Sequence, residues 1–356
     1  MNKFFLALGV SALSPLVLAK PTIVTSIKPV SMVVAAIAGD RAEIQQIVSS
    51  TASPHDFAMR PSDLRKINNA DTVVWVGESL ENFLEKPLEN AGKEASSIEW
   101  LALEGMSLHS FAEEQHHDEN ESEEEHDHDG HEEHEEHDHD GHEEHHDGHE
   151  EHHDGHEEHH DGHEEHHEEH EEHAEHHDEH EGHNHDGIDP HVWLSPDNAR
   201  VLAKAVAARL VSLDAENATY YKGNLAAFEK GLTAKDAEIR QALSKVSTVP
   251  YIVFHDGYRY FEQHYGLSHT GEITVSPERK PGAKKVAEIR REIEENKVQC
   301  VFSEPQFSPA IVETLLEGSS VKTAPLDPLG GNVTMGKNAY FSFLDNLSGQ
   351  FLSCLG

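Results

Sequence analysis

The chain has 356 residues and a formal net charge of −41, with 68 acidic, 27 basic and 33 histidine residues. Between residues 113 and 189 there are 37 acidic residues and no Lys or Arg, which leaves 31 acidic and 27 basic residues elsewhere. The rest of the chain is therefore nearly neutral, has no basic stripe, and gives no indication of a nucleic-acid partner.

The first residues are typical of a secretory signal peptide. Lys3 supplies a short positive region, residues 4–18 are mostly apolar, and Ala19 ends a small-residue cleavage site. Pro15 interrupts the apolar run, which is also shorter than the roughly 20 residues that a membrane span needs. No cysteine stands at the cleavage point to receive a lipid anchor. We therefore expect cleavage after Ala19 and an exported protein, most simply in a bacterial periplasm.

Short strands and helices are predicted to alternate through residues 20–112, the first part of an N-terminal lobe. Strands are expected at 22–27, 44–48 and 71–76, and helices at 31–39, from 61 onwards and at 78–91. This close alternation is typical of βαβ units with a largely parallel sheet.

An acidic insert follows at residues 113–187 and contains 27 histidines, with the heptapeptide HHDGHEE starting at 145, 152 and 159. Its seven-residue period has no apolar seam, so a coiled coil is excluded. Without apolar surface to bury, the insert should be disordered in the absence of metal. We expect it to bind several metal ions weakly, and the alternative is a solvated acidic spacer. The clearest candidates are His145, His146, His149, His152, His153, His156, His159, His160 and His163.

The alternation of elements resumes after the insert. Residues 188–214 should complete the N-terminal lobe, and residues 215–248 should form a long, rigid linking helix, because apolar residues recur there every three or four positions. Residues 249–356 should form a C-terminal lobe with strands and helices again in turn. The predicted fold class is α/β, with two lobes on central parallel sheets joined by the long helix.

Three histidines stand where an apolar, strand-like run gives way to a helix start: His55, His191 and His255. In open α/β sheets, ligands bind beyond the carboxyl ends of the strands, so positions far apart in sequence can meet there. At any single position a structural or surface histidine is the better interpretation. Three such positions together predict that these imidazoles bind one zinc ion between the lobes.

Aspartates accompany each of these histidines. Asp327 follows a fourth strand-like run and could serve as a fourth ligand, directly or through water. Asp56, Asp189 and Asp256 could accept hydrogen bonds from the rings and fix which nitrogen faces the metal.

Two other classes of function use similar residues. A zinc hydrolase also has three protein ligands and an open position, but no HExxH helix or nucleophile elbow is present, and we expect no enzyme. A histidine-rich metal-storage protein would leave the two lobes without a role.

The chain has two cysteines, Cys300 and Cys354. In an exported protein such a pair is most simply a disulfide. Two buried thiols or soft metal ligands are the alternative.

Five segments resemble those of the high-affinity zinc-uptake periplasmic binding proteins, a branch of the cluster A-I solute-binding proteins of ABC importers. They are SPHDFAMRPSD at 53–63, DPHVWLSP at 189–196, FHDGY at 254–258, SEPQF at 303–307 and LDPLG at 326–330. The resemblance covers the mature chain outside the insert, and the histidine-rich insert is similar too. It implies two (β/α)4-like lobes and a membrane permease with its ATPase as partner. We also expect a monomer.

The resemblance also implies residue roles. The family's zinc ligands match His55, His191 and His255, and its disulfide matches the two cysteines. Manganese-binding relatives usually have a carboxylate at the third position, so a manganese or iron receptor is the alternative within the family. Some zinc members have a glutamate before the first histidine, where this chain has Pro54. The fourth position is therefore either Asp327 or water.

Overall fold

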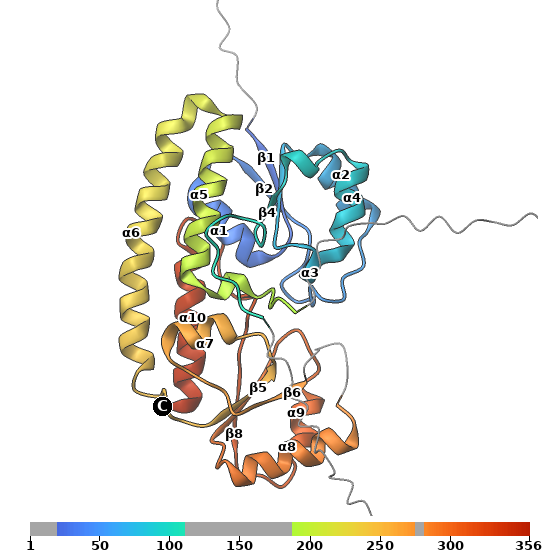
Figure 1. Ribbon diagram of the computed structural model, residues 1–356, viewed down its shortest axis with the longest axis vertical. Coiled ribbons are helices and arrows are strands. Elements are labelled where there is room, and N and C mark those ends of the chain that lie inside the picture. Colours follow the sequence, from blue (N-terminus) through green and yellow to red (C-terminus); the bar gives the residue numbers. More distant parts are fainter. Residues whose placement is uncertain (1–19, 111–186, 275–280) are drawn as a thin grey trace, which may run out of the picture. The chain divides into compact units, whose positions relative to one another are not determined.

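The computed structural model describes residues 20–110, 187–274 and 281–356. Two parallel four-stranded sheets, with strand orders β2-β1-β3-β4 and β6-β5-β7-β8, are flanked by helices (Figure 1). The predicted α/β class with two lobes is confirmed. We call the lobe built on the first sheet the first lobe and the other the second lobe.

The first lobe contains the elements before the long helix. Its strands are β1 (Thr22–Thr25), β2 (Glu43–Gln46), β3 (Thr72–Trp75) and β4 (Ile98–Glu99). Its α-helices are α1 (Lys28–Ala38), α2 (Pro61–Asn69), α3 (Glu78–Glu81), α4 (Glu85–Asn90) and α5 (Pro196–Leu213). Short 3₁₀ helices are η1 (Asn82–Leu84), η2 (Glu94–Ser96) and η3 (Val192–Leu194), and η4 (Ala215–Asn217) leads to the long helix α6 (Ala218–Leu243).

The second lobe repeats the plan. Its strands are β5 (Tyr251–His255), β6 (Gly271–Thr274), β7 (Cys300–Ser303) and β8 (Lys322–Pro325). Its helices are α7 (Arg259–Tyr265), α8 (Ala283–Glu295), α9 (Ala310–Leu315) and α10 (Ala339–Leu355).

Local sequence signals explain where several helices begin. Helices α1, α2 and α5 each have a proline in the first turn, where the missing N–H costs nothing. Ser195 caps α5 by accepting a hydrogen bond from the backbone N of Asn198 at 3.2 Å.

The long helix α6 buries one apolar stripe, formed by Tyr221, Phe228, Leu232, Ile239 and Leu243. It packs on α5, α1 and α10 along most of its length (Figure 1). Because side chains on three neighbouring helices hold it, α6 is a rigid support rather than a flexible connection.

Two features differ from the sequence-based expectations. The helix predicted at 78–91 is divided into α3, η1 and α4. The backbone leaves helical geometry at Glu81, and Pro87 cannot donate a hydrogen bond to the turn before α4. The terminal helix α10 was not predicted, although Phe343, Leu347 and Phe351 recur on one buried face. The predicted disulfide is confirmed: Cys300 on β7 is joined to Cys354 on α10.

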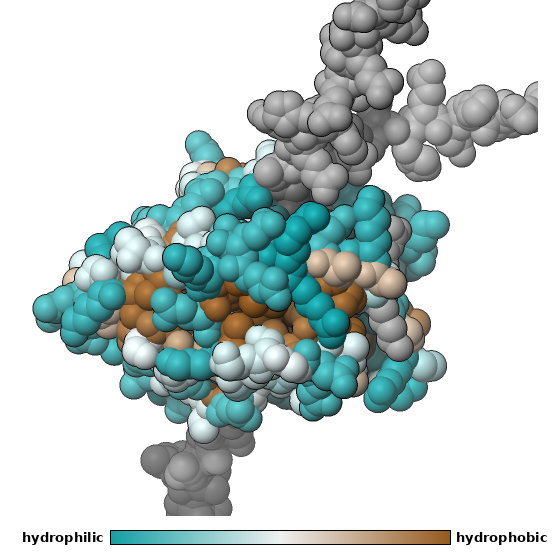
Figure 2. Space-filling view, turned by 90° about the horizontal axis from the view of Figure 1, so that it is seen from below, coloured by the Kyte–Doolittle hydropathy of each residue, from teal (hydrophilic) through white to brown (hydrophobic). Residues whose placement is uncertain are grey.

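The apolar side chains form a large cluster and a smaller one, the latter between the second sheet and α8 and α9. Figure 2 shows one face of the molecule, where hydrophilic residues surround a band of apolar ones. Among the described helices, none combines the length and apolar character needed to cross a membrane.

The predicted signal peptide and nearly all of the insert lie outside the described residues. The residues flanking the insert are described. Ser110 and Ile188 pair in an antiparallel bridge, and the backbone N of Asp189 donates to the O of His109 at 2.8 Å. The chain therefore leaves the first lobe and returns to it at one place.

Candidate metal centre

The three histidines selected from the sequence come from both lobes. His55 lies in the loop between β2 and α2, His191 directly precedes η3, and His255 is the last residue of β5. His191 and His255 are only 2% and 3% exposed, and His55 is half-buried.

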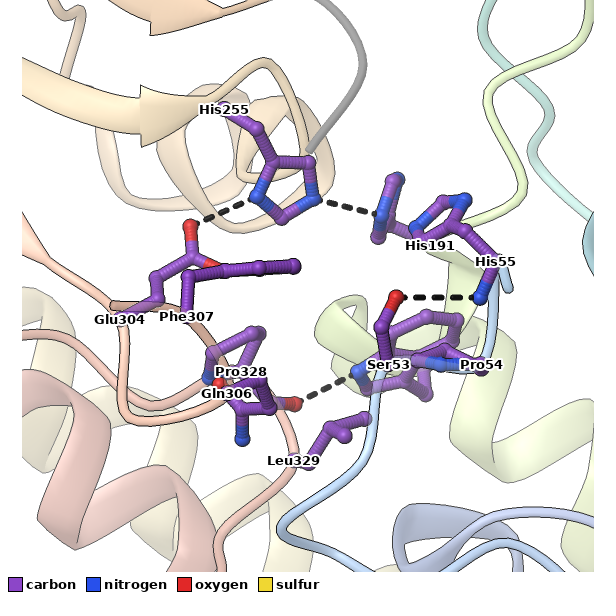
Figure 3. Close-up of a pocket in the computed structure, with 11 residues that line it drawn as sticks. Ser53, Pro54, His55, His191, His255, Glu304, Gln306, Phe307, Pro328 and Leu329 are labelled. Atoms are coloured by element: carbon purple, nitrogen blue, oxygen red, sulfur yellow. Dashed lines mark hydrogen bonds and ion pairs between the residues drawn. The ribbon is translucent and has the colours of Figure 1, made fainter. Parts of the chain in front are cut away.

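The structure brings these three imidazoles together (Figure 3). Ring centroids are 5.3 Å apart for His55 and His191, 5.7 Å for His55 and His255, and 5.0 Å for His191 and His255. One ligand atom of each lies within 4.8 Å of those of the other two. Within the part of the chain that the structure describes, this is the one such group of His, Cys, Asp or Glu side chains.

Asp189 fixes the orientation of His191. Its Oδ1 lies 2.7 Å from Nδ1 of the ring and also accepts from the backbone N of His191 at 3.0 Å. The carboxylate is fully buried and only two residues away. An acceptor at Nδ1 favours a proton on that atom and leaves Nε2 to face the other two rings.

Glu304 does the same for His255, and this residue was not predicted as part of the site. Its Oε1 lies 2.6 Å from Nδ1 of His255 (Figure 3). Glu304 directly follows β7, the neighbour of β5 in the sheet. Its position just after a strand was the signal that could have identified it.

The two other aspartates predicted to orient rings have different surroundings. Asp256 accepts a hydrogen bond from Arg259 at 3.1 Å, and Asp56 is exposed.

The two Nε2 atoms that face each other are hydrogen-bonded, and their spacing is close to that of two ligands of one ion. Nε2 of His255 lies 3.1 Å from Nε2 of His191. Two nitrogens at 2.0–2.1 Å from a tetrahedral zinc lie roughly 3.4 Å apart, so the pair needs only a small adjustment. A nitrogen of His55 lies within 4.8 Å of both and could act as a third donor.

Burial and neighbouring charges act oppositely on two of the rings. Burial, together with repulsion from His191 and His255, holds the pKa of His55 well below its usual range. Burial also acts to lower the pKa of His255, but the carboxylates of Glu304, Asp189 and Asp256 together outweigh it, so this pKa is raised. In the metal-free protein His55 is therefore neutral and ready to bind, whereas His255 keeps a proton more firmly.

Gly257 leaves the space in which these nitrogens meet. A Cβ on this residue would lie 2.4 Å from Nε2 of His255 and 2.9 Å from Nε2 of His191. Any side chain here would occupy the metal position.

Asp327 lies outside the histidine group. Its Oδ1 accepts from Nε2 of Gln306 at 2.9 Å and from the backbone N of Leu329 at 3.1 Å. Its Oδ2 accepts from the backbone N of Gly331 at 2.6 Å. The carboxylate is thus already well supplied with donors. The insert histidines 145–163 lie outside the described residues.

Comparisons with known proteins match nearly the whole chain to one family. The family described as zinc-uptake complex component A, periplasmic, matches residues 23–354. The high-affinity zinc uptake system protein ZnuA of Yersinia pestis is 34% identical over 355 residues, covering 100% of this chain and 98% of that protein. The protein of the same name from Haemophilus influenzae is 40% identical over 352 residues, covering 98% and 97%.

Solved structures share the fold. A crystal structure of ZnuA has a TM-score of 0.66 at 21% identity, covering 95% of this chain and 100% of that one. The laminin binding protein of Streptococcus agalactiae, described as an adhesin with metal transporting activity, has a TM-score of 0.64 at 19% identity, covering 94% and 100%.

Proposed function

The chain belongs to the family of periplasmic zinc-uptake complex component A, and on this premise we propose that it is the zinc receptor of a high-affinity import system. It captures Zn²⁺ in the periplasm and delivers it to a membrane permease driven by an ATPase. Zinc is the cargo, so the site must both hold the ion and release it. The receptor acts as a monomer and is exported by a signal peptide cleaved after Ala19.

One observation carries the proposal: His55, His191 and His255 converge from two lobes with their ligand atoms within 4.8 Å of one another. Buried carboxylates hold two of the rings with Nε2 facing the common point. Three neutral imidazoles bring no negative charge, and Asp189 and Glu304 supply it from behind the rings. Such outer carboxylates raise the basicity of the ligating nitrogens.

The donor set favours zinc over manganese. Imidazole nitrogens suit Zn²⁺, whereas Mn²⁺ prefers carboxylate, carbonyl and water oxygens. This supports the zinc assignment over a manganese or iron receptor of the same family.

We infer that water takes the fourth position. Asp327 accepts three hydrogen bonds where it stands, and recruiting it would break bonds to Gln306, Leu329 or Gly331. Pro54, directly before His55, offers no donor atom in its side chain.

The proposed function also assigns a role to each part of the chain. Residues 20–112 and 188–214 make up the first lobe, residues 215–248 the linking segment, and residues 249–356 the second lobe. The insert at 113–187 is a low-affinity zinc antenna that raises the local zinc concentration near the receptor. Equilibrium dialysis of a variant lacking the insert should give a lower zinc stoichiometry, and an unchanged value would rule out the antenna.

The test of the zinc site is calorimetric titration of wild type and His255→Ala. Wild type should show one tight site, which His255→Ala loses and which the variant without residues 113–187 keeps. Equal affinity in wild type and His255→Ala would remove this histidine from the site. A receptor only binds and releases zinc. The zinc-loaded protein should therefore hydrolyse neither esters nor peptides, which a zinc hydrolase would do.

A further inference from the structure

Asp327 is the centre of a hydrogen-bond network that joins the two lobes beside the metal centre. The residue follows β8 and is only 6% exposed. Its carboxylate accepts from Nε2 of Gln306 and from two backbone N–H groups of its own loop, those of Leu329 and Gly331. Hydrogen bonds to a charged carboxylate are stronger than neutral ones, so this arrangement fixes the amide of Gln306.

Gln306 carries the network to the first lobe. The same Nε2 donates to the backbone O of Ser50 at 3.1 Å, across 256 residues of sequence. Ser50 lies in the loop between β2 and α2 that also carries His55. Exchanging the amide N and O would set an oxygen against two acceptors, so the network itself fixes the orientation of the amide.

Lys28 makes a second bond between the lobes at the same place. This first residue of α1 donates from Nζ to the backbone O of Gly331 at 2.6 Å. A Cβ at Gly331 would lie 3.2 Å from Oδ2 of Asp327 and 3.8 Å from the O of Ser50. The Lys28–Gly331 and Gln306–Ser50 hydrogen bonds are therefore close together. An ammonium at a helix N-terminus is unfavourable by itself. Burial lowers the pKa of Lys28, and the nearby carboxylate of Asp327 offsets part of this effect.

The network touches the metal centre directly. Gln306 lines the same cavity as the three histidines (Figure 3). Two residues earlier, Glu304 binds the ring of His255. One short segment after β7 therefore holds His255 with one side chain and the loop of His55 with another.

We propose that Gln306, Asp327 and Lys28 form an interlobe latch that holds the loop of His55 against the second lobe and sets the rate at which zinc leaves. The inference rests on the proposed zinc-receptor function. Carboxylates fix the rings of His191 and His255, whereas the position of His55 depends on its loop. Opening the latch withdraws one of three nitrogens without removing any ligand, which suits a receptor that must release its cargo.

Zinc dissociation from the full chain tests the latch. The protein is loaded with one equivalent of zinc, and a weak chelator removes zinc from the weaker sites. The protein is then mixed with an excess of a strong chromophoric chelator. Gln306→Leu should increase the rate of zinc dissociation from the tight site about three- to tenfold. This factor corresponds to the net free energy of one hydrogen bond. Lys28→Met, which removes the other bond between the lobes, should act in the same direction.

Gln350→Leu is the matched control. Gln350 on α10 accepts from the backbone N of Asp327 at 2.9 Å, so this variant also removes one glutamine hydrogen bond to Asp327, but within the second lobe. Its dissociation rate should stay within twofold of wild type. An unchanged rate in Gln306→Leu, or an equal rise in the two glutamine variants, overturns the latch.

Cobalt separates a latch from a ligand. Co²⁺-loaded wild type and Asp327→Asn should have the same visible absorption bands, because Asp327 does not touch the metal in this arrangement. A shift of the bands in Asp327→Asn that Gln306→Leu does not share would make Asp327 a ligand and overturn the proposal. If wild type has no tight zinc site, the zinc-receptor function itself is wrong. Failure of the latch and failure of the receptor function are therefore distinguishable.

Discussion

Oε1 of Glu304 lies 2.6 Å from Nδ1 of His255, although 49 residues separate the two in sequence. The contact exists because β5 and β7 are neighbours in a parallel sheet, so that the residues at their carboxyl ends face one another. It gives a buried histidine a fixed tautomer and a raised pKa at once.

Glu304→Gln should therefore weaken zinc binding without removing a ligand. Loss of an outer carboxylate typically costs 10–100-fold in metal affinity, and we expect a decrease of about that size. Competition titration against a chelator of known affinity measures it. Asp256→Asn is the control, because Asp256 pairs with Arg259, and its affinity should stay within about threefold of wild type. Equal losses in both variants would contradict the role of Glu304.

Zinc affinity should fall with decreasing pH, starting above the ordinary histidine pKa. The pKa of His255 is raised in the folded, metal-free protein, and zinc must displace that proton. The protonated ring and Glu304 stabilise the metal-free form below the ordinary histidine pKa, and this stabilisation is lost as pH rises through the raised pKa.

The measurement is the midpoint of apparent zinc affinity against pH. Glu304→Gln should move the midpoint to lower pH, because the carboxylate that retains the proton is gone. A midpoint that does not move would show that His255 is not the proton competing with zinc.

Gly257→Ala should abolish tight zinc binding while the protein stays folded. The new methyl group would lie 2.4 Å from Nε2 of His255, so it takes the place of the ion or pushes the ring aside. Gly223→Ala, in α6 with open space around it, is the matched change and should bind zinc like wild type. Calorimetry and circular dichroism on both variants provide the test, and tight binding by Gly257→Ala would refute it.

Reduction of the bond between Cys300 and Cys354 should lower stability by about 4 kcal/mol on the chain-entropy estimate. The bridge closes a separation of 54 residues and ties β7 to α10, away from the ligand atoms. Urea unfolding with and without reductant measures the change. The number of tight zinc sites should be the same in both conditions, and its loss on reduction would show that the bridge also shapes the site.

The sequence predicted what depends on local pattern and on strand ends. The strands and most helices followed from short apolar runs, and the convergence of His55, His191 and His255 followed from their places after such runs. Asp189 was found because it is two residues from its histidine.

Long-range partners could not be read in this way. Glu304 and His255 meet only through strand order, and Gln306 meets Ser50 only after the lobes have come together. The surroundings of Asp327 depend on both of these steps. Its position after a strand drew attention to it, but the Gln306 amide that binds it comes from another strand end.

The bridge between Ser110 and Ile188 holds together the two residues that flank the insert. Lengthening a loop whose ends are already fixed is inexpensive, about 0.6 kcal/mol for each doubling. Adding or removing heptapeptides should thus have little effect on the stability of the lobes. The stability of the lobes therefore places little constraint on the number of repeats.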